Sequence, residues 1–185
     1  MGCFIGLPQP PTTTDIAYNR MCKYAKQTLV SVKGLDTDKS FFFRDKRGNL
    51  WKLSKHRNAT DASGMYYNNM RAFLLPESHF ILKPAAIQKL TVRAFCMKMG
   101  QASTDMYDFM DEHFDPKSVS KALQDVSEAI RWLHDRRLAH RDIKPENIVL
   151  HDDRWKLIDF DFCSPLEQFA HCGTEHFVCP PSVTK

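Results

Sequence analysis

The first half of the chain alternates between short apolar runs and turn-forming residues, a pattern typical of β-strands. A turn-forming segment, 45–49, separates two of the runs and predicts a hairpin. A helix is expected over 64–75, because Pro76 would end it. Together these pieces predict a small, mostly antiparallel β lobe. The five runs expected as strands are 29–32, 41–43, 50–53, 80–82 and 92–97.

The second half begins with a long amphipathic helix, predicted over 116–137. Asp115 followed by Pro116 is typical of a helix start, since an acid caps the first turn and proline fits its first position. Farther on, the apolar runs 148–150 and 155–158 flank a short polar segment, which predicts a second hairpin. The apolar residues of the helix recur every three or four positions, at Val119, Leu123, Val126, Ile130 and Leu133.

Composition places the chain among globular proteins. Of its 185 residues 43% are hydrophobic and 26% charged, which excludes wholesale disorder. The net charge of +4 is small and scattered, so no nucleic-acid partner is expected. No apolar run is long enough to cross a bilayer, so no membrane association is expected either. The six cysteines form no CxxC pair and no secretory signal precedes them, which favours an intracellular location, cytoplasmic or nuclear.

One polar segment between the helix and the second hairpin carries residues suited to phosphoryl transfer. That reaction needs an acceptor held in line, a divalent metal ion and a cation near the transferred group. Asp142 can orient and deprotonate a hydroxyl, and Lys144 can neutralise a γ-phosphate. Asn147 offers an oxygen ligand for Mg²⁺, and Asp159, twelve residues later, offers another.

The segment 140–147 resembles the catalytic loop of eukaryotic protein kinases, and the resemblance continues on both sides of it. The segment 97–100 is similar to the hinge of that family, with Met97 as gatekeeper. The backbone of Lys98 and Met99 is then expected to face the adenine of ATP.

The resemblance extends over about residues 27–182 and implies an α+β, bilobal protein-kinase-like fold. A small antiparallel β lobe would precede a mostly helical lobe that is truncated. It divides the chain into an N-terminal extension, 1–26, an N-lobe, 27–97, and a C-lobe, 98–185. It also implies a serine/threonine protein kinase that uses ATP and Mg²⁺. Lys144 and Thr174 look like this branch rather than the tyrosine branch.

The expected phosphate-binding loop departs from the family pattern. It falls at 34–41, where Gly34 is the only one of the three family glycines and is expected to contact the nucleotide. Asp36 stands in place of the second glycine. Side chains there obstruct the approach of phosphate to backbone N–H groups, and carboxylates repel it.

The nucleotide lysine of the third strand is either Lys52 or Lys55. Strand alternation favours Lys52, because its neighbours Trp51 and Leu53 suit the core of a lobe. A solvated strand lysine with no contact to a nucleotide stays an alternative.

The carboxylate that normally pairs with this lysine is missing from the following helix. The expected window, 67–71, holds Asn68 and Asn69, which can donate hydrogen bonds but cannot neutralise an ammonium. Because that helix lacks the acid, the ion pair that positions the lysine is expected to be weak or absent. Separately, Asp161 replaces the glycine of the metal-binding motif that begins at Asp159.

Two functions stay open from the sequence. The first is the protein kinase, acting on a protein substrate. The second is a kinase mimic of little or no activity that binds and inhibits another kinase or its substrate. The helices that cover the long amphipathic helix in the family are not found here, so its apolar face is expected to be uncovered. Such a face would favour a protein partner or a homodimer. The residues expected on it are Leu123, Val126, Ile130 and Leu133.

A group of cysteines and histidines between 163 and 179 raises the alternative of a zinc site. Their spacing fits no standard zinc pattern, and three of them fall within the kinase-like segment. These residues are Cys163, His171, Cys172, His176 and Cys179.

Overall fold

A computed structural model gives the architecture of most of the chain. The N-terminal extension expected at 1–26, Gly34 and most of the expected phosphate loop lie outside the described residues. The structure describes residues 30–31, 40–44, 47, 49–112, 114–168 and 172–177.

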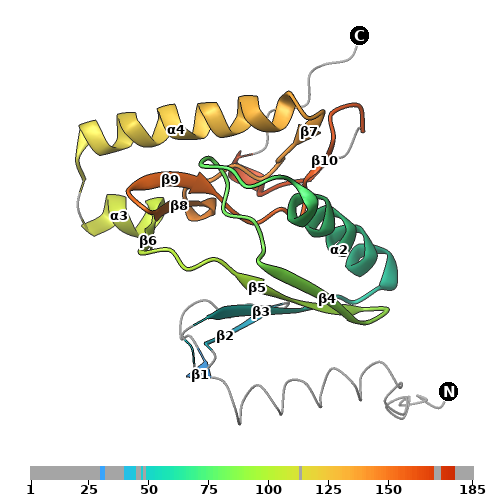
Figure 1. Cartoon of the computed structure of the whole chain (residues 1–185). Helices are drawn as coiled ribbons and strands as arrows, with labels where there is room; N and C mark the ends of the chain where they lie inside the picture. Colours follow the sequence, from blue (N-terminus) through green and yellow to red (C-terminus); the bar gives the residue numbers. More distant parts are fainter. Residues whose placement is uncertain are drawn as a thin grey trace, which may run out of the picture.

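A five-stranded antiparallel sheet forms one side of the molecule (Figure 1). Its order is β1-β2-β3-β5-β4. Phe42 lies opposite Lys52 and Arg44 opposite Leu50, which confirms the predicted first hairpin. A small apolar cluster that includes Leu53 and Phe43 covers one face of the sheet. The strands are Val30–Ser31 (β1), Ser40–Arg44 (β2), Leu50–Lys55 (β3), Ala86–Thr91 (β4) and Ala94–Met99 (β5).

Helix α2, Ala59–Leu74, follows the third strand and begins five residues before the predicted start. The earlier start is set by Asn58, whose side-chain oxygen accepts a hydrogen bond from the backbone N–H of Asp61 at 2.7 Å. This contact satisfies one of the open donors of the first turn. The helix stops at Leu74, just before the predicted breaker Pro76.

The prediction of a strand at 80–82 is wrong. This segment instead lies along the second lobe, where Leu157 donates to the carbonyl of Phe80 at 3.1 Å and accepts from Leu82 at 2.9 Å. Ile81 is buried and forms an isolated parallel bridge with Leu157. The strand that pairs with β5 comes a few residues later, as β4. This strand was not predicted, because two consecutive polar residues, the exposed Gln88 and Lys89, interrupt the alternation of apolar and polar residues that is typical of a strand.

In its described residues, the second lobe contains two α-helices, short strands and two 3-10 turns (Figure 1). Asp115 caps α4 by accepting from the N–H groups of Lys117 and Ser118, as its sequence predicts. The predicted second hairpin is also present. Its two-residue turn, Asp152 and Asp153, has positive φ at both positions, as a type I′ turn requires. The elements are β6 (Thr104–Asp105), α3 (Met106–Glu112), α4 (Pro116–His134), β7 (Leu138–Ala139), β8 (Ile148–His151), β9 (Arg154–Leu157) and β10 (Ser164–Pro165).

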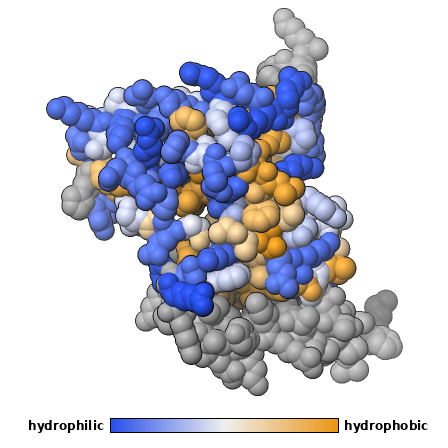
Figure 2. All heavy atoms as spheres, viewed as in Figure 1, coloured by the Kyte–Doolittle hydropathy of each residue, from blue (hydrophilic) through white to orange (hydrophobic). Residues whose placement is uncertain are grey.

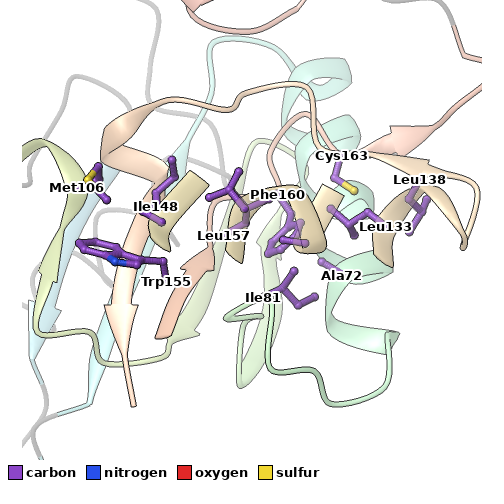
Figure 3. Close-up of a cluster of buried hydrophobic side chains, with 13 residues drawn as sticks. Ala72, Ile81, Met106, Leu133, Leu138, Ile148, Trp155, Leu157, Phe160 and Cys163 are labelled. Carbon is purple, nitrogen blue, oxygen red and sulfur yellow. The ribbon is translucent and has the colours of Figure 1, made fainter. Parts of the chain in front are cut away.

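The expectation that α4 leaves its apolar face uncovered is wrong for half of the residues named. Val126 and Leu133 are buried in the main core, between α4 and the strands β7 to β9. Figure 3 shows Leu133 among the other side chains of this core. Ile130 is half-buried against the same core, and of the four only Leu123 is exposed, at 62%. The buried face differs from the expected one because it includes Ala122, Ala129 and Asp125 in addition to Val126 and Leu133. The Asp125 carboxylate accepts from the backbone N–H of Trp155 at 3.1 Å. The buried residues of α4 are Ala122, Asp125, Val126, Ala129 and Leu133.

The α+β class expected from the sequence is confirmed, with the antiparallel sheet in one lobe and the longest helix in the other. In Figure 2 the surface that carries α4 is mainly hydrophilic, and hydrophobic side chains gather farther down, near α2. None of the described helices is both long and apolar enough to span a membrane. Within the described ranges, no group of three or more histidine, cysteine or acidic residues could hold a metal ion. His171 and Cys179 of the expected zinc alternative lie outside those ranges.

Candidate active site

A cleft of about 320 Å³ separates the two lobes and is lined from both sides. This volume is within the range of small-molecule binding sites. Leu50 of β3 and Val149 of β8 contribute apolar walls. Lys52, Asn147 and Asp159 place polar groups at the same cavity. The cleft therefore combines a surface suited to a flat ring with an end suited to anions and cations.

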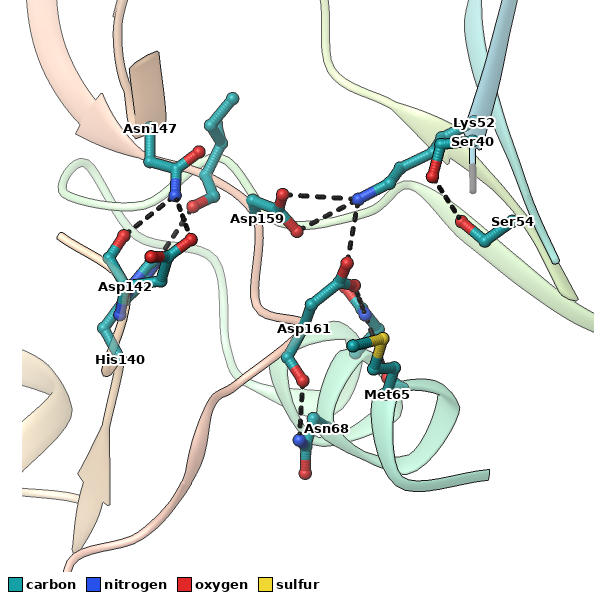
Figure 4. Close-up of polar contacts among 12 residues, drawn as sticks. Ser40, Lys52, Ser54, Met65, Asn68, His140, Asp142, Asn147, Asp159 and Asp161 are labelled. Atoms are coloured by element: carbon teal, nitrogen blue, oxygen red, sulfur yellow. Dashed lines mark hydrogen bonds and ion pairs between the residues drawn. The ribbon is translucent and has the colours of Figure 1, made fainter. Parts of the chain in front are cut away.

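Lys52 projects from the sheet into an ion-pair cluster, as Figure 4 shows. Its Nζ lies 3.1 Å from Oδ1 of Asp159 and 3.0 Å from Oδ2 of Asp161. Burial opposes the charge on Lys52, but the attraction of the two carboxylates outweighs it and raises the pKa of the lysine. Lys55, the alternative, does not line the described cleft. The strand alternation therefore identifies the lysine that reaches Asp159.

Asp142 is buried and has a dense set of hydrogen bonds. Its Oδ1 accepts from the backbone N–H of Thr174 at 2.9 Å and from the Thr174 hydroxyl at 2.7 Å. Its Oδ2 accepts from Asn147 Nδ2 at 3.0 Å and lies 3.4 Å from Lys144 Nζ. Lys144 also donates to the Thr174 hydroxyl at 2.8 Å. The loop that bears Asp142 is thus held to the later segment that bears Thr174.

Asn147 and Asp159 bring two hard oxygen donors to the cleft. The amide nitrogen of Asn147 is committed to Asp142, so its oxygen is the atom left for a ligand. Asp159 takes a positive φ of 61°, and its side chain is 28% exposed. Burial and the neighbouring Asp161 raise the pKa of Asp159 against the attraction of Lys52. The donor set of one amide oxygen and one carboxylate fits Mg²⁺.

The structure does not place Lys98 in the cleft. Its carbonyl accepts from the N–H of Ala85 at 2.8 Å, and the residue lies between two neighbouring strands of the sheet. Met97 is fully buried and does not line the cavity, whereas Met99 does. The chain crosses from β5 to β6 at 100–103, whereas the sequence match placed the hinge at 97–100. The reason is the length of β5, which stays paired with β3 as far as Met99.

Asp161 is the main residue of the site whose role the sequence did not reveal. From the sequence it stood out only as a replacement for glycine, but the structure places its carboxylate on Lys52 and against α2. Burial disfavours its charge, but the attraction of Lys52 and a hydrogen bond from Asn69 outweigh this and lower the pKa of Asp161. Asp105 also lines the cleft, where burial raises its pKa, and no sequence signal pointed to it.

Comparison with known proteins agrees with this geometry. The family model described as the protein kinase domain matches residues 51–185. MAP kinase-interacting serine/threonine-protein kinase 2 of Xenopus laevis is 33% identical over 87 residues, which is 38% of this chain and 19% of that protein. MAP kinase-activated protein kinase 2 is 33% identical over 95 residues in both Cricetulus longicaudatus and Homo sapiens. That stretch is 46% of this chain, 28% of the hamster protein and 23% of the human one.

The matched stretches thus span between about a fifth and just over a quarter of these relatives. The family match itself covers more than half of the chain, including the catalytic loop and most of the residues that line the cleft. The chain belongs to the protein kinase superfamily.

Proposed function

We propose that the protein is an ATP-dependent serine/threonine protein kinase that transfers the γ-phosphoryl group of ATP to a hydroxyl of a protein substrate. The observation that carries the proposal is the convergence of Asp142, Lys144, Asn147 and Asp159 beside one cleft. A binding module has no need for all four residues in this arrangement. The division into 1–26, 27–97 and 98–185 and the intracellular location belong to the same proposal.

The cleft suits a nucleotide in the following way. The adenine lies between the apolar walls that Leu50 and Val149 provide, with Met99 at the edge nearest the crossing between the lobes. Lys52 contacts the α- and β-phosphates. Gly34, which the sequence assigns to the phosphate loop, completes this part of the proposal. When bound, Mg²⁺ neutralises phosphate oxygens, and Asn147 and Asp159 would hold it.

The transfer step follows from the positions of Asp142 and Lys144. The substrate hydroxyl oxygen bonds to the γ-phosphorus as the bond from that phosphorus to the β–γ bridging oxygen breaks, and ADP leaves. Asp142 accepts the proton of the hydroxyl. Lys144 lies 3.4 Å from this carboxylate and neutralises the charge on the γ-phosphoryl oxygens.

Incubation of the purified chain with Mg·ATP labelled on the γ-phosphate and a generic protein acceptor tests the proposal. We expect Asp142→Asn to lower transfer by about 10²–10⁴-fold, because the variant keeps the shape of the side chain but cannot act as a base. Asp135→Asn is the matched control. Asp135 is exposed after the last turn of α4, and its variant should retain full activity.

Absence of transfer by the unmodified chain would contradict the proposal. If the same preparation then forms a tight complex with a protein kinase or its substrate, the molecule acts as an inhibitory mimic instead. The lack of a carboxylate on α2 beside Lys52 favours that second function. The single acid of this helix, Asp61, lies in its first turn, and Asn68 and Asn69 donate to Asp161 rather than pair with the lysine.

A further inference from the structure

The buried Lys52 ammonium has two carboxylate partners, and both come from the segment that follows β9. Nζ lies 3.1 Å from Oδ1 and 3.3 Å from Oδ2 of Asp159, and 3.0 Å from Oδ2 of Asp161. Helix α2 packs beside this cluster but carries a single carboxylate, Asp61. That residue lies in the first turn and is hydrogen-bonded to the cap residue Asn58. Among the residues that the structure describes, the carboxylates that face Lys52 are therefore those of Asp159 and Asp161.

Helix α2 instead donates hydrogen bonds to Asp161. Nδ2 of Asn69 donates to Oδ1 of Asp161 at 2.6 Å. Nδ2 of Asn68 donates to the backbone carbonyl of Asp161 at 2.7 Å, as Figure 4 shows. Asn69 is only 1% exposed, and the same nitrogen also donates to the carbonyl of Met65 at 2.9 Å. One oxygen of the Asp161 carboxylate thus faces the helix and the other faces Lys52.

The two carboxylates differ in what else they face. The Asp159 side chain is 28% exposed and lines the cleft, whereas that of Asp161 is 16% exposed and does not line it. A cation in the cleft would draw on Asp159, and Asp161 would still neutralise the lysine. A buried ammonium that loses its only partner is strongly destabilised, so a second partner outside the ligand site matters.

The backbone at position 161 accepts a side chain in this arrangement. Asp159, two residues earlier, has a positive φ, but Asp161 is not among the described residues that have one. A residue with a side chain therefore fits there without the strain that would call for glycine. Aspartate at this position is consistent with the conformation that brings Asp159 to the cleft.

We propose that Asp161 is a positioning residue for phosphoryl transfer, which holds Lys52 at the nucleotide site and is itself held by Asn68 and Asn69 of α2. The proposal rests on the proposed kinase function, since Lys52 is taken to contact the phosphates of ATP. Asp161 therefore couples α2 to the sheet by charge on one side and by amide hydrogen bonds on the other.

Relocation of the carboxylate tests this role. Asp161→Gly should lower kcat/KM for ATP at least tenfold, because Lys52 loses the partner that keeps it in place. Asn69→Glu in the same chain places a longer acid on α2, facing the space that Asp161 leaves. We expect kcat/KM of the double variant to be at least threefold higher than that of Asp161→Gly.

Alone, Asn69→Glu should lower the activity, because the new carboxylate repels that of Asp161. Asp153→Asn, on the exposed turn of the second hairpin, serves as a control that keeps activity.

An unfolding experiment in denaturant supplies a readout that needs no activity. The losses in free energy of unfolding caused by Lys52→Met and by Asp161→Asn should be non-additive. The double variant should be no less stable than the less stable of the two single variants. Additive losses together with no recovery by Asn69→Glu would overturn the proposal. If the unmodified chain transfers no phosphate but the losses are non-additive, the proposed kinase function fails and the pairing of Lys52 with Asp161 stands.

Discussion

Single residues shape the cleft where the chain crosses between the lobes, and Gly100 shows this most clearly. A Cβ at this position would lie 2.5 Å from Cδ1 and 2.6 Å from Cγ of Leu82. Such distances are well inside van der Waals contact, so one of the two residues would have to move. Leu82 lines the cleft, as Gly100 does, and its movement would change the space offered to a ligand.

Gly100→Ala should therefore raise the KM for ATP severalfold and lower stability by about 1–3 kcal/mol, as overpacking does. Gly64→Ala is the matched control, because a Cβ there meets no atom within 4 Å and the position lies on an exposed part of α2. This control should leave the KM unchanged and raise stability by about 0.5–1 kcal/mol. ATP-dependent kinetics and thermal unfolding of both variants measure the difference. An unchanged KM in Gly100→Ala would show that Leu82 yields without altering the site.

The sequence was informative about residues whose role depends on local spacing. Lys52 was separated from Lys55 by strand alternation, and the structure places its ammonium on Asp159. Asp161 could not be interpreted in this way, because its partners come from β3 and α2, which are distant in the sequence. The expectation that the Lys98 backbone faces the cleft did not hold for a related reason. Sequence spacing did not show how far β5 stays paired with its neighbours.

At the level of elements, helix α4 shows how packing selects a face of an amphipathic helix. Leu133 is completely buried in the main core, while Leu123 on the same helix is 62% exposed. Both belong to the apolar repeat in the sequence, so the repeat alone does not separate them. The buried face also includes Ala122 and Ala129, which lie with Val126 in the main core, so small residues that the repeat does not count belong to the packed side of the helix.

We expect Leu133→Ala to lower the free energy of unfolding by about 2–5 kcal/mol, because the variant leaves a cavity in a packed core. Leu123→Ala removes the same atoms from an exposed site and should change it by less than about 0.5 kcal/mol. Denaturant unfolding of the two variants gives both values. Similar losses in the two would mean that Leu123 is also covered in the folded protein, by a second copy or by part of the chain outside the described residues.

Elements with a strong local signal were predictable, and those defined by long-range pairing were not. The hairpin of β8 and β9 was evident from two apolar runs around a polar turn, and Asp115 marked the start of α4. The segment 80–82 has the composition of a strand, but it pairs with Leu157 of the other lobe. Its burial there, rather than its local pattern, explains why it is apolar.

At the level of the whole molecule, His140 joins the catalytic loop to the strand that leads into Asp159. One ring nitrogen, Nε2, lies 2.8 Å from the carbonyl of Ile158, and the other, Nδ1, accepts from the N–H of Asp142 at 3.3 Å. The ring also packs edge-on against Phe160, with 5.2 Å between centroids. A neutral imidazole with its proton on Nε2 satisfies both contacts, whereas a proton on Nδ1 would oppose the N–H of Asp142.

Burial lowers the pKa of His140 below the ordinary value of 6.5, although its contact with Ile158 and the charges of Asp159 and Asp142 act in the opposite direction. The unfolded chain then binds a proton at this residue before the folded chain does. Stability should therefore fall as the pH drops below about 6.5, by up to about 1.4 kcal/mol per pH unit, until the folded pKa is reached.

His140→Gln removes the titrating group and should flatten this part of the profile, even if it lowers stability overall. His134→Gln, at an exposed position on α4, should keep the slope of the unmodified protein, because that side chain is exposed to water in both states. Denaturant unfolding between about pH 5 and 8 measures the three profiles. An equal slope in His140→Gln and the unmodified protein would mean that other groups, the cleft carboxylates foremost, set the acid sensitivity of the fold.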